Sequence, residues 1–285
     1  MSEKGFSVLQ SLIDNLYESM IECVVQAKDN NVQNDFYQEI HTLCVDHNIP
    51  VVDKKEKLSI KSPYCIAISW RWIIPINESN KLIVLHDSLL PKYRGFAPLV
   101  NMLINREERI GVTALFANKE FDRGDIIAQR SAEVHYPIRI QDAIELISPL
   151  YAQTVVDIFE QLSAGQSLTS RPQNEQEASY SLWRDEEDYH IDWSGEASTI
   201  QQMIFSVGYP YKGAYSWVDD EKLRIIDCET MKDVVIENRT PGKILFMEEG
   251  KPVVVCGKGL LHLTQVTNDE GVDMLPLQKF RIRFK

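Results

Sequence analysis

One histidine and one aspartate are placed so that they could form an acid–base pair. His86 ends the apolar run Lys81–His86, which is typical of a buried strand, and Asp122 lies in the polar loop Phe121–Asp125. α/β sheets bind ligands beyond the carboxyl ends of their strands, and a nearby carboxylate orients an imidazole and stabilises its charged form. This placement allows general acid–base chemistry but does not by itself establish it. The alternative is a strand-end histidine that hydrogen-bonds only to backbone.

The turn after this strand carries two cations around an aromatic residue. Lys92 and Arg94 flank Tyr93, and a helix-like run through Asn105 begins at Arg94 with Pro98 near its start. Backbone amides and cationic side chains between a strand and a helix favour a bound anion. We predict that Lys92, Tyr93 and Arg94 contact the substrate; the alternative is that both cations are merely solvated.

The blocks around these residues resemble the formyltransferase family. They are His-Asp-Ser-Leu-Leu-Pro-Lys-Tyr-Arg-Gly at 86–95, Gly-Val-Thr at 111–113 and Asp-Arg-Gly-Asp at 122–125. The resemblance implies transfer of a formyl group from 10-formyltetrahydrofolate to a substrate amine through a tetrahedral intermediate. It implies that His86 accepts the amine proton or donates to the oxyanion, and that Asp122 holds His86 and relays protons.

Position 84 departs from the family pattern. The family places an asparagine two residues before the histidine, and this chain has Val84 there. Side chains alternate along a strand, so Val84 is expected on the same side as His86 and Asp87 on the other. Another donor, such as Asn118 or a backbone N–H, would then have to stabilise the oxyanion. The alternatives are a folate-binding relative, a hydrolytic relative, or a protein without catalysis.

A tryptophan pair is the second feature that the resemblance assigns to the site. Ser69–Ile74 resembles the segment that begins the folate pocket of sugar N-formyltransferases. It implies cofactor-binding roles for Trp70, Arg71 and Trp72, and the later loop adds Asp125. The two tryptophans could instead be core aromatics, and Asp125 could serve to turn its loop. The histidines and cysteines lack metal-ligand spacing, so no metal is expected.

Strands and helices alternate through the first half of the chain, which predicts an α/β class, Rossmann-like fold. We expect a mostly parallel sheet with helices on both faces, followed beyond residue 205 by a small, mainly β, OB-like domain. The expected domains are a formyltransferase-like catalytic domain at 1–170, an acidic connector at 171–204 and a β-rich domain at 205–285. The apolar runs expected as strands of the first domain are 21–26, 51–52, 64–69, 81–86, 111–116 and 125–129.

Three further helices are expected, besides the helix-like run that begins at Arg94. The segments 1–15 and 34–44 each have an apolar face, and a longer amphipathic segment around Pro149 ends near Gly165. A Rossmann-like domain normally begins with a strand, and the first helix leaves no room for one. Either the sheet has lost a strand or the chain begins later than its relatives.

Composition limits the partners that the protein can have. The net charge of −12, from 30 basic and 42 acidic residues, argues against DNA or anionic membranes as partners. The longest apolar stretches are far shorter than the roughly 20 residues of a membrane span, and no secretory signal is visible. Five cysteines without a C-x-x-C pattern are typical of buried thiols in a reducing compartment, so we expect a cytoplasmic protein.

The distribution of charge favours a nucleotide-linked amino sugar over tRNA as the formyl acceptor. Residues 205–285 hold 12 basic and 12 acidic side chains, and residues 171–200 hold eight acidic and two basic ones. A tRNA needs many cation–phosphate contacts, whereas a diphosphate with a base needs only a few cations and an aromatic ring. We therefore expect a small-molecule substrate of polysaccharide biosynthesis, with methionyl-tRNA as the alternative. A homodimer is compatible with either.

Overall fold

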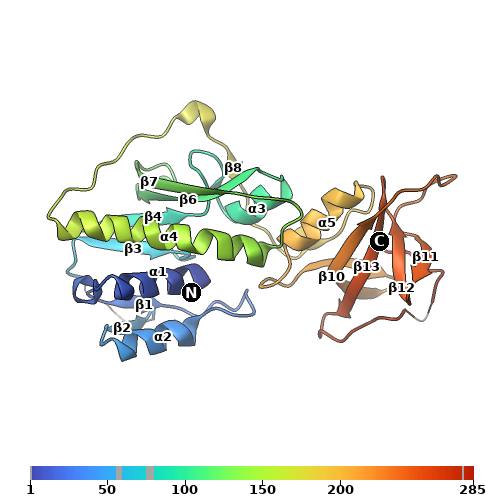
Figure 1. The fold of residues 1–285 in the computed structure, drawn as a ribbon, viewed down its shortest axis with the longest axis horizontal. Coiled ribbons are helices and arrows are strands. Elements are labelled where there is room, and N and C mark those ends of the chain that lie inside the picture. The colour runs from blue at the N-terminus through green and yellow to red at the C-terminus, as the bar shows by residue number, and fades with distance from the viewer. Residues whose placement is uncertain (1, 56–59, 75–79, 278) are drawn as a thin grey trace. The chain divides into compact units, whose positions relative to one another are not determined.

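The computed structural model describes residues 2–55, 60–74, 80–277 and 279–285 (Figure 1). The chain forms two compact units, each built from three segments. Unit 1 consists of Met1–Leu99, Glu108–Val134 and Asp142–Trp183. Unit 2 consists of Val100–Glu107, His135–Gln141 and Arg184–Lys285.

These boundaries differ from the expected domain limits. The segment expected as a connector is shared between the units, with 171–183 in unit 1 and 184–204 in unit 2. Hydrogen bonding explains the first part, because the backbone of Arg171 pairs with that of Ile126 in both directions. The second part includes helix α5 (Ala197–Ser206), whose buried face packs against residues 221–231 within unit 2. The acidic composition of residues 171–204 suggested a solvated connector because it reports the exposed side chains. It carries no information about the backbone hydrogen bonds of the segment.

Unit 1 contains a four-stranded sheet in the order β3-β4-β6-β7. Its strands are β3 (Tyr64–Ile68), β4 (Lys81–His86), β6 (Arg109–Phe116) and β7 (Ile126–Glu133). β3 and β4 run parallel, whereas β4, β6 and β7 pair antiparallel. The Rossmann-like α/β class is confirmed, with a mixed sheet in place of the mostly parallel one.

The remaining strands at the start of unit 1 form a separate parallel pair. β1 (Val24–Gln26) pairs with β2 (Val51–Asp53), so the one sheet expected from the sequence is found in two pieces. Side chains tie the pieces together at both ends. The Glu22 carboxylate accepts hydrogen bonds from the amides of residues 61 and 62 before β3, and Asp29 pairs with Arg71 after β3.

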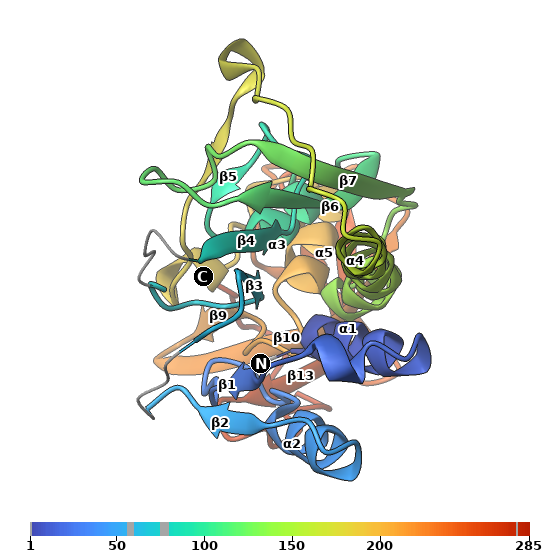
Figure 2. The ribbon, with the colours of Figure 1, turned by 90° about the vertical axis from the view of Figure 1, so that its left-hand side faces the viewer.

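Helices α1 (Glu3–Asp14), α2 (Tyr37–Asp46) and most of α4 (Ile140–Ser163) belong to unit 1 and lie on the same side of its strands (Figure 2). Ser2 caps α1 by accepting a hydrogen bond from the amide of Gly5. The apolar face of α1 packs on α2, which buries Leu9 and Ile13. α4 runs as one helix across Pro149. The described residues contain no helix long and apolar enough to span a membrane.

A short ribbon replaces the start of the helix-like run expected from Arg94 through Asn105. Residues 94–95 form β5 (Arg94–Gly95), which pairs in parallel with β8 (Tyr180–Ser181), and helix α3 (Pro98–Ile104) starts only at Pro98. One-turn 3-10 helices lie outside the sheets of both units. They are η1 (Glu18–Met20), η2 (Glu175–Glu177) and η3 (Glu187–Tyr189).

Unit 2 contains the expected antiparallel β domain. Its five strands lie in the order β11-β12-β13-β10-β9. Residues 283–285 pair with both edges of this sheet, through Phe284 with Val218 of β9 and through Arg283 with Lys243 beside β11. These bridges satisfy part of the backbone groups at each edge, which closure of a barrel would satisfy along the whole strand. The strands are β9 (Ala214–Val218), β10 (Glu221–Met231), β11 (Ile244–Glu248), β12 (Lys251–Val255) and β13 (Leu260–Asn268).

Candidate active site

His86 ends β4 in a buried position, with only 7% of its surface exposed. Its Nε2 lies 2.8 Å from the carbonyl oxygen of Tyr93, and its Nδ1 lies 3.6 Å from Oδ1 of Asp122. A carbonyl oxygen only accepts, so Nε2 carries a hydrogen and donates it. Nδ1 is therefore the ring atom that can take up a proton, and it faces a carboxylate at a distance beyond a direct hydrogen bond.

Asp122 is held by backbone as well as by its position in the loop. Its Oδ2 accepts a hydrogen bond of 2.9 Å from the amide of Gly95, and its own φ of 56° lies in the left-handed region. The loop also needs Gly124, because a Cβ there would overlap the carbonyl oxygen of Phe116. The motif at 122–125 thus directs one carboxylate oxygen to the β5 backbone and leaves the other facing His86.

A polar network fixes the turn that follows His86. The Thr113 hydroxyl donates to the carbonyl of Ser88 at 2.6 Å and accepts from the amide of Leu90. Gln129 on β7 donates to Thr113 and to the carbonyl of Leu90. Gly111 allows β6 to pass closely, because a Cβ there would overlap the backbone of β7. The block at 111–113 therefore supports the turn that carries Tyr93.

The three residues expected to bind the substrate have different surroundings. Arg94 is fully buried, and its guanidinium donates to Gln173 and, in a bidentate pair, to Glu175. The Glu175 carboxylate raises the pKa of Arg94. The donors of Arg94 are thus committed to the chain itself, which argues against the substrate-binding role predicted for it. Lys92 is exposed, and Tyr93 contributes its carbonyl to His86.

Val84 lies two residues before His86 on the same strand, as the alternation of side chains requires. It is partly buried and packs against Leu90, Leu115 and Ile126. Position 84 therefore offers an apolar surface where the family pattern has an amide. Asn118, one candidate replacement, lies beyond β6 and uses its Oδ1 to accept from the amide of Glu120.

Trp70 and Trp72 form an edge-to-face pair with ring centroids 5.0 Å apart. Lys54 lies over the Trp72 ring, with Nζ 3.3 Å from the centroid. Within the described residues, the buried Trp70 Nε1 has no hydrogen-bond partner, and neither does the neighbouring Ser69 Oγ. Such buried orphan groups are rare, and a bound polar ligand would satisfy them. The segment therefore fits the pterin-binding role that the resemblance implies.

The other two residues predicted to bind the cofactor have structural or surface positions. Arg71 is half exposed and pairs with Asp29 at 2.7 Å. Burial alone would raise the pKa of Asp29, but the hydrogen bonds from Arg71 and Asn31 outweigh it and lower that pKa. Asp125 is exposed, and its backbone carbonyl accepts from the amide of Phe116. The described part of the chain shows no contact between these residues and His86.

A buried ion pair behind His86 was not anticipated from the sequence. Lys4 of α1 lies 2.5 Å from Asp87, which also accepts a hydrogen bond from Tyr151 of α4. Burial alone would raise the pKa of Asp87, but Lys4 and the two hydrogen bonds outweigh it and hold that pKa below its usual value. Asp87 thus faces the helices rather than Asp122, as strand alternation predicted. A lysine 83 positions away in sequence gave no local signal of this contact.

Neither a metal centre nor a redox cysteine pair is indicated among the described residues. They contain no group of three or more His, Cys, Asp or Glu side chains able to hold a metal ion. All five cysteines are free thiols, and burial raises the pKa of Cys44 to about 11. These thiols have the buried or partly buried surroundings that their spacing predicted.

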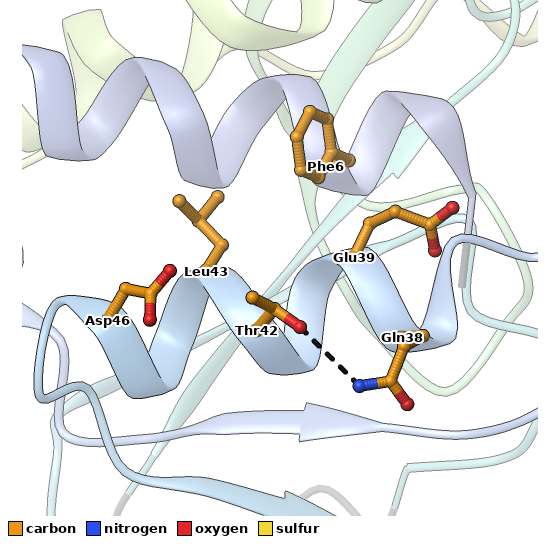
Figure 3. Close-up of a pocket in the computed structure, with 6 residues that line it drawn as sticks. All are labelled: Phe6, Gln38, Glu39, Thr42, Leu43 and Asp46. Carbon is orange, nitrogen blue, oxygen red and sulfur yellow. Dashed lines mark hydrogen bonds between the residues drawn. The ribbon is translucent and has the colours of Figure 1, made fainter.

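A surface hollow between α1 and α2 lies apart from these residues. Figure 3 shows Phe6 of α1 opposite Leu43 of α2, with Glu39 and Asp46 at its margins. The described lining supplies two carboxylates and no cation, which disfavours an anionic ligand. Its lining includes none of the residues predicted for the site.

Comparison with known proteins defines the class to which this fold and site belong. Residues 60–144 match the formyl transferase family model, and residues 184–281 match the model of the formyl transferase C-terminal domain. The chain belongs to the formyltransferase family.

Particular relatives differ in what their names say they act on. A methionyl-tRNA formyltransferase of Citrifermentans bemidjiense is 32% identical over 203 residues, which are 71% of this chain and 62% of that protein. The chain therefore spans about three-fifths of that relative's length. The solved structure of an N-formyltransferase of Helicobacter canadensis contains folinic acid and dTDP-3-aminofucose. It matches this chain with a TM-score of 0.66 at 16% identity, and the match covers 92% of this chain and 96% of the Helicobacter canadensis chain. HypX of Aquifex aeolicus with tetrahydrofolic acid has a TM-score of 0.64 at 18% identity, covering 86% of this chain and 44% of its own.

Proposed function

We propose that this protein transfers a formyl group from 10-formyltetrahydrofolate to the amine of an acceptor. The observation that carries the proposal is the arrangement at His86, whose Nε2 is committed to the Tyr93 carbonyl while Nδ1 faces Asp122. An imidazole held in this way is a base with one defined accepting atom. Family membership supports the same chemistry.

The reaction proposed at this site is a direct transfer from the folate to the amine. The acceptor amine attacks the formyl carbon, forming a C–N bond while the carbonyl π electrons move to oxygen. The amine proton passes to Nδ1 of His86, and the resulting imidazolium is stabilised by Asp122 and by the Tyr93 carbonyl. Collapse of the intermediate re-forms the carbonyl and breaks the bond to N10 of the folate, which takes up the proton that His86 had accepted, so the imidazole returns to its neutral form. The products are the formamide and tetrahydrofolate.

Ser69 and the tryptophan pair are the residues that we propose hold the folate. Ser69 Oγ and Trp70 Nε1 offer polar contacts without partners among the described residues, and the tryptophan rings offer an apolar surface for a pterin. Lys54, over the Trp72 ring, adds a cation near this surface. The folate supplies the activated formyl group, and the chain supplies its orientation.

For the acceptor we propose a nucleotide-linked amino sugar. Residues 205–285 carry no net charge, and several of their cations are already paired with carboxylates. Lys222 and Arg224 both contact Glu186 and Asp269, and Arg239 contacts Asp233. Paired cations release fewer counterions on binding a polyanion, so this unit is poorly suited to tRNA. The exposed Lys92, one residue before Tyr93, remains for a diphosphate.

Methionyl-tRNA is the second candidate acceptor, and the sequence relatives favour it. The Citrifermentans bemidjiense protein described above is a methionyl-tRNA formyltransferase. The two acceptors predict different dependence on salt, because binding of tRNA weakens steeply as salt rises and binding of a sugar nucleotide weakens little.

The proposal is tested by incubating the purified protein with 10-formyltetrahydrofolate and either amino-sugar nucleotides or charged initiator tRNA. Mass spectrometry identifies a formylated sugar, and acid-gel electrophoresis identifies formylated tRNA. We expect a formylated sugar nucleotide, at a rate nearly independent of salt. Formylation of tRNA alone would overturn the choice of acceptor. Absence of product from both classes, with free formate released from the folate, would indicate the hydrolytic alternative.

A further inference from the structure

The side chain of Gln173 connects the two motifs that carry the proposed reaction. Its Nε2 donates to the carbonyl oxygens of Asp122 and Gly124, each at 2.8 Å. Its Oε1 accepts from Nη2 and Nε of Arg94, at 2.8 and 3.1 Å. The orientation of the amide is unambiguous, because carbonyls only accept and a guanidinium only donates. The side chain thus uses both donors and its acceptor within the site's own framework.

These hydrogen bonds fall on the residue whose backbone conformation matters most. Asp122 has a φ of 56°, which costs free energy in a residue with a Cβ and persists only when its surroundings hold it. Gln173 binds the carbonyls on both sides of the turn that contains Arg123. With the Asp122 backbone fixed, its Oδ2 meets the amide of Gly95 and its Oδ1 faces His86.

We propose that Gln173 is the positioning residue of the acid–base pair. It holds Asp122 so that its carboxylate faces Nδ1 of His86 when that atom takes up the amine proton. The inference rests on the proposed formyl transfer. It adds Gln173, which lies outside the motifs at 86–95 and 122–125, to the residues of the proposed site. A charged group that stabilises an imidazolium must be preorganised, and misplacement by about 1 Å can cost about 10²-fold in rate.

The surrounding segment has other anchors, so Gln173 can be changed while the segment stays in place. Glu175 forms its own bidentate pair with Arg94, and β8 keeps its pairing with β5. Arg171 keeps its backbone bonds with Ile126. Removing the Gln173 side chain should therefore release the backbone of residues 122–124 while the segment around residue 173 stays in place.

The test compares Gln173→Met with Gln176→Met, the same change three residues further along the segment at an exposed side chain. We expect Gln173→Met to lower kcat about 10- to 100-fold, with KM for folate and acceptor within about threefold of wild type. Gln176→Met should match wild type. Gln173→Glu is a second variant, for the case in which Gln173→Met folds poorly. The ionised glutamate still accepts from Arg94 but cannot donate to the two carbonyls, so kcat should fall as much as in Gln173→Met.

A spectroscopic readout separates this inference from the proposed function. The ¹⁵N resonances of the His86 ring should shift in Gln173→Met and stay in place in Gln176→Met, whether or not an acceptor has been found. A wild-type protein that transfers no formyl group would end the proposed function, and these resonances would still test the positioning. Equal kcat in the two methionine variants, or a fall in kcat with unchanged His86 resonances, would overturn the inference.

Discussion

At the scale of single residues, the two ring nitrogens of His86 have different partners. Nε2 is fixed by the Tyr93 carbonyl, and Nδ1 faces Asp122 at 3.6 Å. A variant that removes the proposed base, Nδ1, can therefore be distinguished from one that also removes the hydrogen bond to the Tyr93 carbonyl. A glutamine side chain can also donate to a carbonyl, but it cannot accept a proton at neutral pH.

We expect His86→Gln and His86→Ala to lower kcat equally, by about 10²–10⁴-fold, since both remove the base. Steady-state kinetics with saturating formyl donor measures the loss. The amide introduced by His86→Gln can keep the bond to the Tyr93 carbonyl, so this variant should retain more thermal stability than the alanine variant. Full activity in either variant would show that the chemistry lies elsewhere.

Val84 is the residue at which this chain departs from its family. We expect Val84→Asn to raise kcat with little change in KM, because an added donor near the oxyanion stabilises the transition state more than the ground state. Val84→Ala is the matched control, since it also disrupts packing on Leu90, Leu115 and Ile126 but adds no donor. A kcat for Val84→Asn no higher than that of Val84→Ala would show that the added amide does not stabilise the oxyanion, as expected if another group already binds it.

At the scale of secondary-structure elements, helix α1 is joined to the end of β4 by one buried ion pair. Lys4 reaches Asp87, and Tyr151 of α4 binds the same carboxylate. Asp87 follows His86 directly, so this contact connects two helices to the strand that ends at His86. Breaking one partner of such a pair leaves an uncompensated charge.

We expect Lys4→Met to lower the free energy of unfolding by about 3 kcal/mol at pH 7. The pKa of Asp87 is depressed in the folded protein, so its contribution is present above the unfolded value of about 3.9 and is lost as pH falls through the folded value. The difference between variant and wild type should therefore shrink below about pH 4. Urea unfolding at several pH values measures this, and a difference independent of pH would contradict it.

At the scale of the whole molecule, the chain is organised as two units that each contain segments distant in sequence. Unit 2 is completed by residues 283–285, which pair with both β9 and the segment beside β11. Phe284 among them is 1% exposed and lies against Trp193, with ring centroids 5.6 Å apart. The sheet of unit 2 therefore depends on the last residues of the chain.

We expect Phe284→Ala to destabilise unit 2 by about 3–5 kcal/mol, the usual cost of truncating a buried aromatic side chain. Hydrogen exchange resolved by peptide should show faster exchange in β9 and β11 and unchanged exchange in β4 and β6. Uniform acceleration across both units would show that they unfold as one. Phe246→Ala is the control, because Phe246 is 38% exposed on β11.

Local sequence pattern was sufficient to predict several parts of this protein. The strand that ends at His86 was predicted with its bounds, since its apolar run and flanking residues are contiguous. The motifs at 86–95 and 122–125, through the family that they resemble, predicted that His86 and Asp122 would meet, and Nδ1 of His86 lies 3.6 Å from Oδ1 of Asp122. Alternation along a strand was enough to place Val84 on the same side as His86. It also placed Asp87 on the opposite side.

The side chains that those motif residues contact could be known only from the folded chain. Arg94 looked like a free cation because its partners, Gln173 and Glu175, lie about 80 positions away in a segment whose composition is that of a solvated loop. Gln173 carries no local pattern, and Lys4 lies 83 residues from Asp87. Hydrogen bonds between distant segments depend on where the chain returns in space. Periodicity records which face of an element is buried, and it does not record which distant polar group that face will meet.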